Sequence, residues 1–130
     1  MIRIITSSPY RAHTEPLFIA NQILDVNRIN DYMVSVFIYK HIKSDVPTLF
    51  SSFFQSQNSI HSHDTRRSDD LRVPKTKTNV RNFSTRINGA LIWNSIPTVI
   101  RNSKSLIIFK KELKKFLVYK NTSVPIVLTQ

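Results

Sequence analysis

The stretch "INGALIWNSIP", residues 87–97, holds both the single glycine and the single tryptophan of a chain of 130 residues. Gly89 and Trp93 stand about one helical turn apart, shortly before Pro97. Such a concentration suits either an active-site turn or the packed end of a helix. A glycine lets the backbone turn or approach a neighbour closely, and a tryptophan buries a large apolar surface.

The residues around this stretch favour the packed helix end. Their spacing predicts a short helix over residues 87–95, and Pro97 disfavours helical geometry just beyond it. We expect Trp93 to anchor a small core against Leu106 and Phe109. In this interpretation the stretch is architectural.

The best-defined helix follows it, toward the C-terminus. Ser103 or Ser105 can cap its start, and Asn121 offers a stop. Its apolar stripe at helical spacing consists of Leu106, Phe109, Leu113, Phe116 and Leu117. The lysines off this stripe include Lys110, Lys111, Lys114 and Lys115.

Two helices are predicted upstream, over residues 14–21 with Thr14 as N-cap and over residues 27–43. The second has an apolar stripe so wide that it requires partners on more than one side. The stripe comprises Ile29, Tyr32, Met33, Val34, Val36, Phe37, Ile38, Tyr39 and Ile42. This helix therefore suits a body larger than the present chain.

The predicted organisation has four parts. Residues 1–54 are helical and include one or two helical turns in "PTLFSSFF", 55–70 are a polar loop, 71–121 a basic segment and 122–130 a tail. Short strands are expected in "LRVP" and "NFSTR". The fold class is a mainly α, small helical fragment with one or two short β-strands.

Composition excludes several kinds of chemistry. Zero cysteines exclude disulfides and thiolate ligands, and a single glycine excludes a P-loop or a dinucleotide fingerprint. No serine stands in a nucleophile elbow. No apolar run is long enough for a membrane span, so we expect no membrane partner and a cytoplasmic or nuclear protein that is not secreted.

Two fragments superficially suggest metal chemistry. "RRSDD" ends in two adjacent aspartates, as in the magnesium hairpin of polymerases, but Arg67 occupies the aromatic position. His61, His63 and Asp64 supply too few ligands from a single element. We predict no metal, no cofactor and no catalytic residue, and we expect Asp70 to contribute little to stability.

The charge is uneven along the chain. Residues 1–65 hold five Lys or Arg and five Asp or Glu, whereas residues 66–130 hold fourteen against three. An excess of this size favours a polyanion partner, and we predict contact with the backbone of RNA or DNA. A basic face kept for solubility is the alternative. The candidate contacts are Arg72, Lys75, Lys77, Arg81, Arg86, Lys110, Lys111, Lys114 and Lys115.

Several stretches together resemble a known family. They are "RIIT" (3–6), "AHTEPLF" (12–18), "IL" (23–24), "FIYK" (37–40), "HDTR" (63–66), "LRVPKTKTN" (71–79), "GALIWNSIP" (89–97) and "NSKSLIIFKKELKKFL" (102–117). In order and spacing the chain resembles, over nearly its whole length, the segment after the polymerase thumb in the reverse transcriptase of animal non-LTR retrotransposons of the jockey type.

The resemblance implies a fragment that is incomplete without the upstream thumb domain, its missing partner. The family's magnesium-binding carboxylates lie upstream and match no position here, so the resemblance implies a non-catalytic remnant. Its alternatives are the clipped end of an active RNA-directed DNA polymerase and a module that docks on the polymerase thumb. The matching motif positions, architectural in role, are Thr65, Arg66, Leu71, Pro74, Gly89, Trp93, Asn94, Ser95, Pro97, Phe109, Lys110 and Leu113.

Overall fold

The longest helix, α3, covers Val26–Ile42 in a computed structural model that describes residues 2–59, 69–75, 77–78 and 84–120. It begins where the side chain of Asp25 accepts a hydrogen bond from the backbone N–H of Arg28 at 2.8 Å. The predicted helix over 27–43 is therefore confirmed to within one residue at each end.

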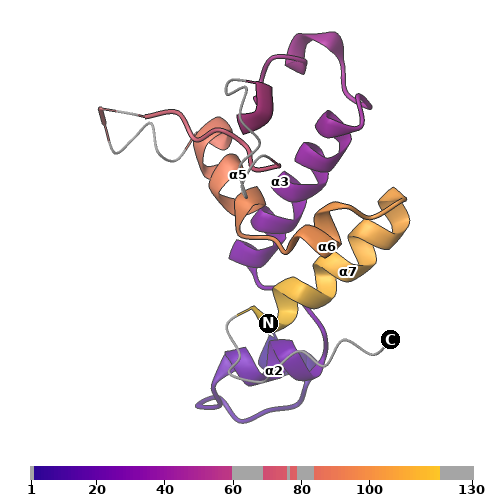
Figure 1. Ribbon diagram of the computed structural model, residues 1–130. Coiled ribbons are helices and arrows are strands. Elements are labelled where there is room, and N and C mark those ends of the chain that lie inside the picture. Colours follow the sequence, from indigo (N-terminus) through magenta and orange to yellow (C-terminus); the bar gives the residue numbers. More distant parts are fainter. Residues whose placement is uncertain (1, 60–68, 76, 79–83, 121–130) are drawn as a thin grey trace.

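Helices α5 (Thr85–Asn94) and α7 (Leu106–Tyr119) both pack against α3 (Figure 1). The ring of Tyr39 on α3 stacks on Phe109 of α7 with 4.3 Å between centroids, and its hydroxyl donates to the carbonyl oxygen of Ser103 at 2.8 Å. Ser105 caps α7 by accepting from the N–H of Ile108, as one of the two predicted caps. The buried core comprises Ile38, Tyr39, Phe54, Leu71, Ala90, Trp93, Ile96, Phe109, Leu113 and Leu117.

Gly89 lies in the middle of α5, where it permits close packing of two helices. A Cβ atom at this position would stand 3.2 Å from Cγ1 of Val34 and 3.3 Å from Cδ1 of Ile38, both on α3. Its φ angle is not positive. The close-approach part of the prediction is confirmed, whereas a turn at this glycine is wrong.

The remainder of the stretch 87–97 is architectural too. Trp93 is 3% exposed, and its ring centroid lies 5.9 Å from that of Phe109, which confirms one of its two expected neighbours. Pro97 occupies the N-cap position of α6 (Thr98–Arg101), a short helix that the sequence did not predict.

The remaining helices are short. A pair near the N-terminus contact each other, and the second of them also contacts α7. Residue 13 takes the N-cap position of that second helix, so the prediction of Thr14 as cap was wrong by one residue. These elements are α1 (Ile2–Ile5), α2 (Thr14–Ala20) and the 3-10 helices η1 (Thr48–Phe50) and η2 (Gln57–Ser59).

Three helix ends use left-handed residues other than glycine. Ser7, Gln22 and Ser44 have φ angles of 50°, 52° and 58° after α1, α2 and α3. Glycine is the usual residue at such positions because it has no Cβ to collide with the backbone. The only glycine of the chain lies instead within α5, at its contact with α3.

The described residues form a mainly helical small domain with six α-helices, which confirms the predicted class, but they contain no strand. One isolated antiparallel bridge pairs Ser56 with Leu71. It does not extend toward Val73, because the next ladder hydrogen bond would need an N–H at Pro74, which has none. The side chain of Asn94 bonds the N–H and the carbonyl oxygen of Leu71 on the edge that faces away from Ser56, at 2.9 Å each. The expected strand in "LRVP" was therefore wrong.

The second expected strand, "NFSTR" (82–86), is also wrong for residues 84–86, which the structure describes. Ser84 is the N-cap of α5, and the next two residues are helical. Residues 82 and 83 lie outside the described part, as do Asn121 and the tail 122–130. Within the described part, no helix combines the length and apolarity needed to cross a membrane.

Candidate nucleic-acid interface

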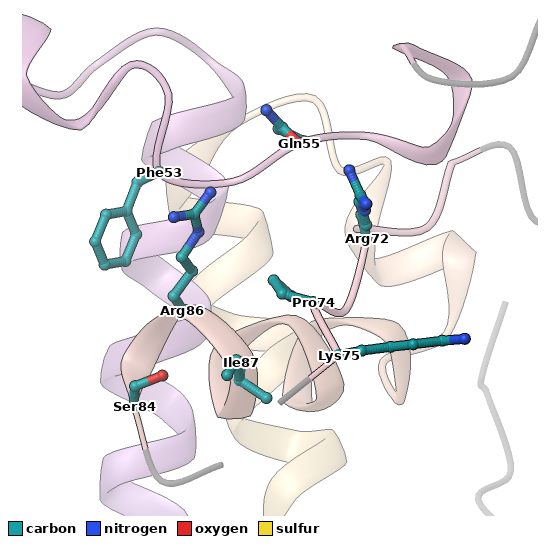
Figure 2. A pocket seen from close by; sticks show the side chains of 8 residues that line it. All are labelled: Phe53, Gln55, Arg72, Pro74, Lys75, Ser84, Arg86 and Ile87. Atoms are coloured by element: carbon teal, nitrogen blue, oxygen red, sulfur yellow. The ribbon is translucent and has the colours of Figure 1, made fainter. Parts of the chain in front are cut away.

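Three of the predicted contact residues line one surface pocket of about 300 Å³. Arg72 and Lys75 come from the extended segment after the Leu71 bridge, and Arg86 from the first turn of α5. Figure 2 shows Arg86 extending beside Phe53, Arg72 on the other side of Pro74, and Lys75 pointing away from both. We call this the cationic pocket; its lining is Phe53, Gln55, Arg72, Pro74, Lys75, Ser84, Arg86 and Ile87.

Backbone hydrogen bonds hold the two extended walls of the cationic pocket together. The N–H of Arg72 donates to the carbonyl oxygen of Gln55 at 2.8 Å, and the N–H of Gln57 donates to that of Asp70 at 2.9 Å. Asn94 joins Leu71 to α5 from the other side. The basic segment is therefore positioned by the folded body even though it is not a strand.

Among the described residues, the charges of the cationic pocket have no acidic counterpart. Its lining contains no Asp or Glu, and Arg72, Lys75 and Arg86 are exposed and take part in no ion pair within the described residues. Unpaired cations at one concave site raise the local concentration of anions.

The first turn of α5 adds to this positive character. It contains no acidic residue, and the hydroxyl of the N-cap Ser84 makes no capping hydrogen bond. Free N–H groups and the helix dipole give the start of a helix a partial positive charge. Ser84 and Arg86 therefore contribute a donor and a cation at the same end of the helix.

Two other arginines have a structural role. Arg28 is 8% exposed and lies 3.2 Å from a carboxylate oxygen of Glu15. The Arg101 side chain is 9% exposed and donates to a carboxylate oxygen of Asp70 at 2.8 Å. The expectation that Asp70 contributes little is therefore revised, because it neutralises a nearly buried guanidinium.

The predicted lysines of α7 lie on a separate element from the cationic pocket. Lys110, Lys111, Lys114 and Lys115 are exposed, as expected for residues off the apolar stripe, and Lys115 approaches Glu112 at 3.3 Å. None of these four lines the cationic pocket. The structure thus divides the predicted contacts into two groups.

The other candidates fall in different places. Lys77 is exposed but does not line the cationic pocket, and Arg81 lies outside the described residues. Thr65, Arg66 and the histidine fragment around His63 also lie outside them. Among the residues that the structure does describe, no group of three or more His, Cys, Asp or Glu could hold a metal ion.

Sequence reasoning missed Phe53, Gln55 and Ser84 as neighbours of the basic residues. Phe53 belongs to "PTLFSSFF", about twenty residues before Arg72, and no local spacing links the two. Phe83, the aromatic residue that lies among these basic residues in the sequence, is outside the described residues.

One carboxyl has a shifted pKa. Burial raises the pKa of Asp31 above its ordinary value, the charge of Lys120 opposes this, and Asp25 reinforces it. Asp31 does not line the cationic pocket.

Comparison with known proteins identifies no relative: no family model matches the chain, and neither a curated protein nor a solved structure matches it.

Proposed function

We propose that the chain is a non-catalytic remnant of the C-terminal region of a non-LTR retrotransposon reverse transcriptase, and that its basic surface contacts the backbone of RNA or DNA. Nucleic-acid binding is supported by Arg72, Lys75 and Arg86, which are exposed at one pocket and have no acidic partner among the described residues. Such cations bind phosphates with an affinity that depends on salt and little on sequence.

The lysines of α7 add a second contact surface. Lys110 and Lys114 are exposed on one helix, four positions apart, so their ammonium groups project from neighbouring turns. A nucleic acid that extends from the cationic pocket to α7 would meet this further positive charge.

Filter binding of the whole chain to RNA and to DNA across a salt series tests the proposal. We expect log affinity to fall linearly with log salt concentration. Replacement of both Lys110 and Lys114 by Ser should reduce that slope by about 1.4 for a single strand if both contact phosphates. Affinity that is absent, or indifferent to salt, overturns the proposed function.

A second candidate function is docking on a polymerase thumb domain. Val26, Ile29 and Met33 lie along one face of α3 and are 82%, 48% and 62% exposed. This face is opposite the side on which Ile38 is buried. Apolar residues left exposed at helical spacing are typical of a protein contact.

Size-exclusion chromatography of the chain, and of the variant Met33→Lys, tests this second candidate. Docking predicts oligomers or poor solubility for the unmodified chain and a monomer for the variant. A clean monomer for both contradicts it.

A further inference from the structure

The cationic pocket contains an aromatic ring that phosphate binding alone does not require. Phe53 is half-buried and lines the pocket beside Arg86 (Figure 2). Its ring is surrounded by three other phenyl rings in edge-on contact, with centroids 6.4 Å away for Phe37, 6.0 Å for Phe50 and 5.1 Å for Phe54. Phe53 is therefore held in place by its neighbours.

The surroundings of Phe53 combine two kinds of contact. Pro74 and Ile87 add apolar surface to the pocket, while Arg72 and Arg86 supply cations from two different segments. An aromatic ring next to cations is the arrangement with which proteins bind single strands, since the base stacks and the phosphates are neutralised. A base inside a duplex is already stacked on both faces and cannot enter such a pocket.

The size of the pocket sets the amount of nucleic acid it can take. Its volume of about 300 Å³ lies at the lower end of the range for small-molecule pockets. A pocket of this size suits one nucleotide.

We infer that the cationic pocket binds one unpaired nucleotide of a single strand, with the base against Phe53 and the phosphate between Arg72 and Arg86. The inference rests on the proposed function and narrows it, because phosphate contacts alone do not distinguish single strands from duplexes. The ring and the two guanidinium groups, from three different segments, form one site.

Fluorescence anisotropy with the whole chain tests the inference, using oligouridine and oligothymidine of about 12 nucleotides and duplexes of the same length. The single strands should bind more tightly than the duplexes. Phe53→Leu removes the ring but keeps an apolar side chain, and should weaken single-strand binding by about 5- to 150-fold, the range for loss of one stacked base. Its duplex affinity should stay unchanged.

Phe50→Leu is the matched control. Phe50 contacts Phe37 and Phe53 in the same aromatic cluster but does not line the pocket. Circular dichroism and thermal unfolding of both variants establish that each is folded. Equal weakening by Phe50→Leu and Phe53→Leu, or no weakening by Phe53→Leu, overturns the inference.

A crosslinking measurement on the unmodified chain removes any dependence on the folding of variants. Oligouridine with a 5-iodouracil base is irradiated in the complex, and the crosslinked peptide is identified by mass spectrometry. Attachment at Phe53 supports the inference, and attachment confined to other segments overturns it.

The outcomes also separate the two proposals. Salt-dependent binding to single strands and duplexes alike, unaffected by Phe53→Leu, contradicts the single-nucleotide site and leaves the proposed function intact. Absence of salt-dependent binding to either form contradicts the proposed function itself.

Discussion

Two pockets are lined in part by the segment 69–75, and they differ in whether their arginines are exposed or paired with a carboxylate. In the cationic pocket, Arg72 and Arg86 are exposed and have no carboxylate partner in the part of the chain that the structure describes. In the second pocket, of about 310 Å³, Arg101 is nearly buried and bound to Asp70. The lining of this second pocket is Tyr39, Ile42, Lys43, Ser56, Asp69, Leu71, Trp93, Thr98, Arg101 and Asn102.

Because the two pockets differ in whether their arginines are paired, clustering of basic residues in the sequence does not by itself identify a binding surface. Arg101 lies in the same basic half of the chain as Arg72, but its charge is neutralised within the fold. A charge that is already paired and desolvated has little left to offer a phosphate. Substitutions in the second pocket should therefore change stability, and substitutions in the cationic pocket should change binding.

The largest expected effect is in the core beside the second pocket. Trp93→Ala should lower the free energy of unfolding by about 3–5 kcal/mol, because it removes a buried ring and leaves a cavity against Phe109. Urea denaturation followed by circular dichroism measures this. A loss of less than about 1 kcal/mol would show that Trp93 is not part of the structural centre.

The pair Asp70 and Arg101 should give the next largest effect. Asp70→Ala leaves the nearly buried guanidinium of Arg101 without its carboxylate partner. The Nε of this guanidinium already has no hydrogen-bond partner within the described residues. We expect a loss of about 2–4 kcal/mol, below that of a fully buried pair because Asp70 retains some exposure. Asp69→Ala is the control, since only its backbone carbonyl faces Arg101. Equal losses from the two variants would refute a structural role for this pair.

Asn94 should have a smaller effect. Asn94→Ala removes both hydrogen bonds to the backbone of Leu71, and we expect a loss of about 1–3 kcal/mol. Asn88→Ala, on the same helix, removes an asparagine that makes no side-chain hydrogen bond within the described residues. Chemical denaturation of both variants measures the difference in the free energy of unfolding. If Asn94→Ala loses no more stability than Asn88→Ala, the two hydrogen bonds between Asn94 and Leu71 do not stabilise the fold.

Asp31 extends the comparison to a carboxyl that forms no ion pair within the described residues. Its pKa is raised in the folded chain, so the folded state holds the proton more readily than the unfolded state does. Stability attributable to this group is therefore present in acid and falls as pH rises through the raised pKa. Asp31→Asn should be slightly more stable than the unmodified chain at neutral pH and equal to it in acid. The free energy of unfolding is measured at both pH values, with Asp45→Asn at an exposed position as the control. A variant Asp31→Asn that is less stable than the unmodified chain at neutral pH would contradict the expected direction.

The sequence predicted those parts of the fold that depend on local periodicity. The helices α3 and α7, the cap at Ser105 and the burial of Trp93 follow from spacing and residue size. The expected strand in "LRVP" was wrong because Pro74 cannot donate the next ladder hydrogen bond, so the pairing of Leu71 with Ser56 stays a single bridge. That Asn94 bonds the other edge of Leu71 is a contact between distant residues that local spacing does not show.

The candidate site was predictable only in part, for a similar reason. Arg72, Lys75 and Arg86 are visible as a basic cluster, but Phe53 comes beside them through contacts between distant residues, among them the bridge of Ser56 with Leu71. The pairing of Asp70 with Arg101 also joins residues 31 positions apart, so charge counting could not separate this arginine from the exposed ones.

The most direct test of the central claim compares Arg86→Ser with Arg11→Ser in single-strand binding across a salt series. Both arginines are exposed, but only Arg86 lines the cationic pocket. We expect Arg86→Ser to lower the slope of log affinity against log salt by about 0.7, which corresponds to one phosphate contact, and Arg11→Ser to leave the slope unchanged. Identical slopes for both variants and the unmodified chain would contradict it.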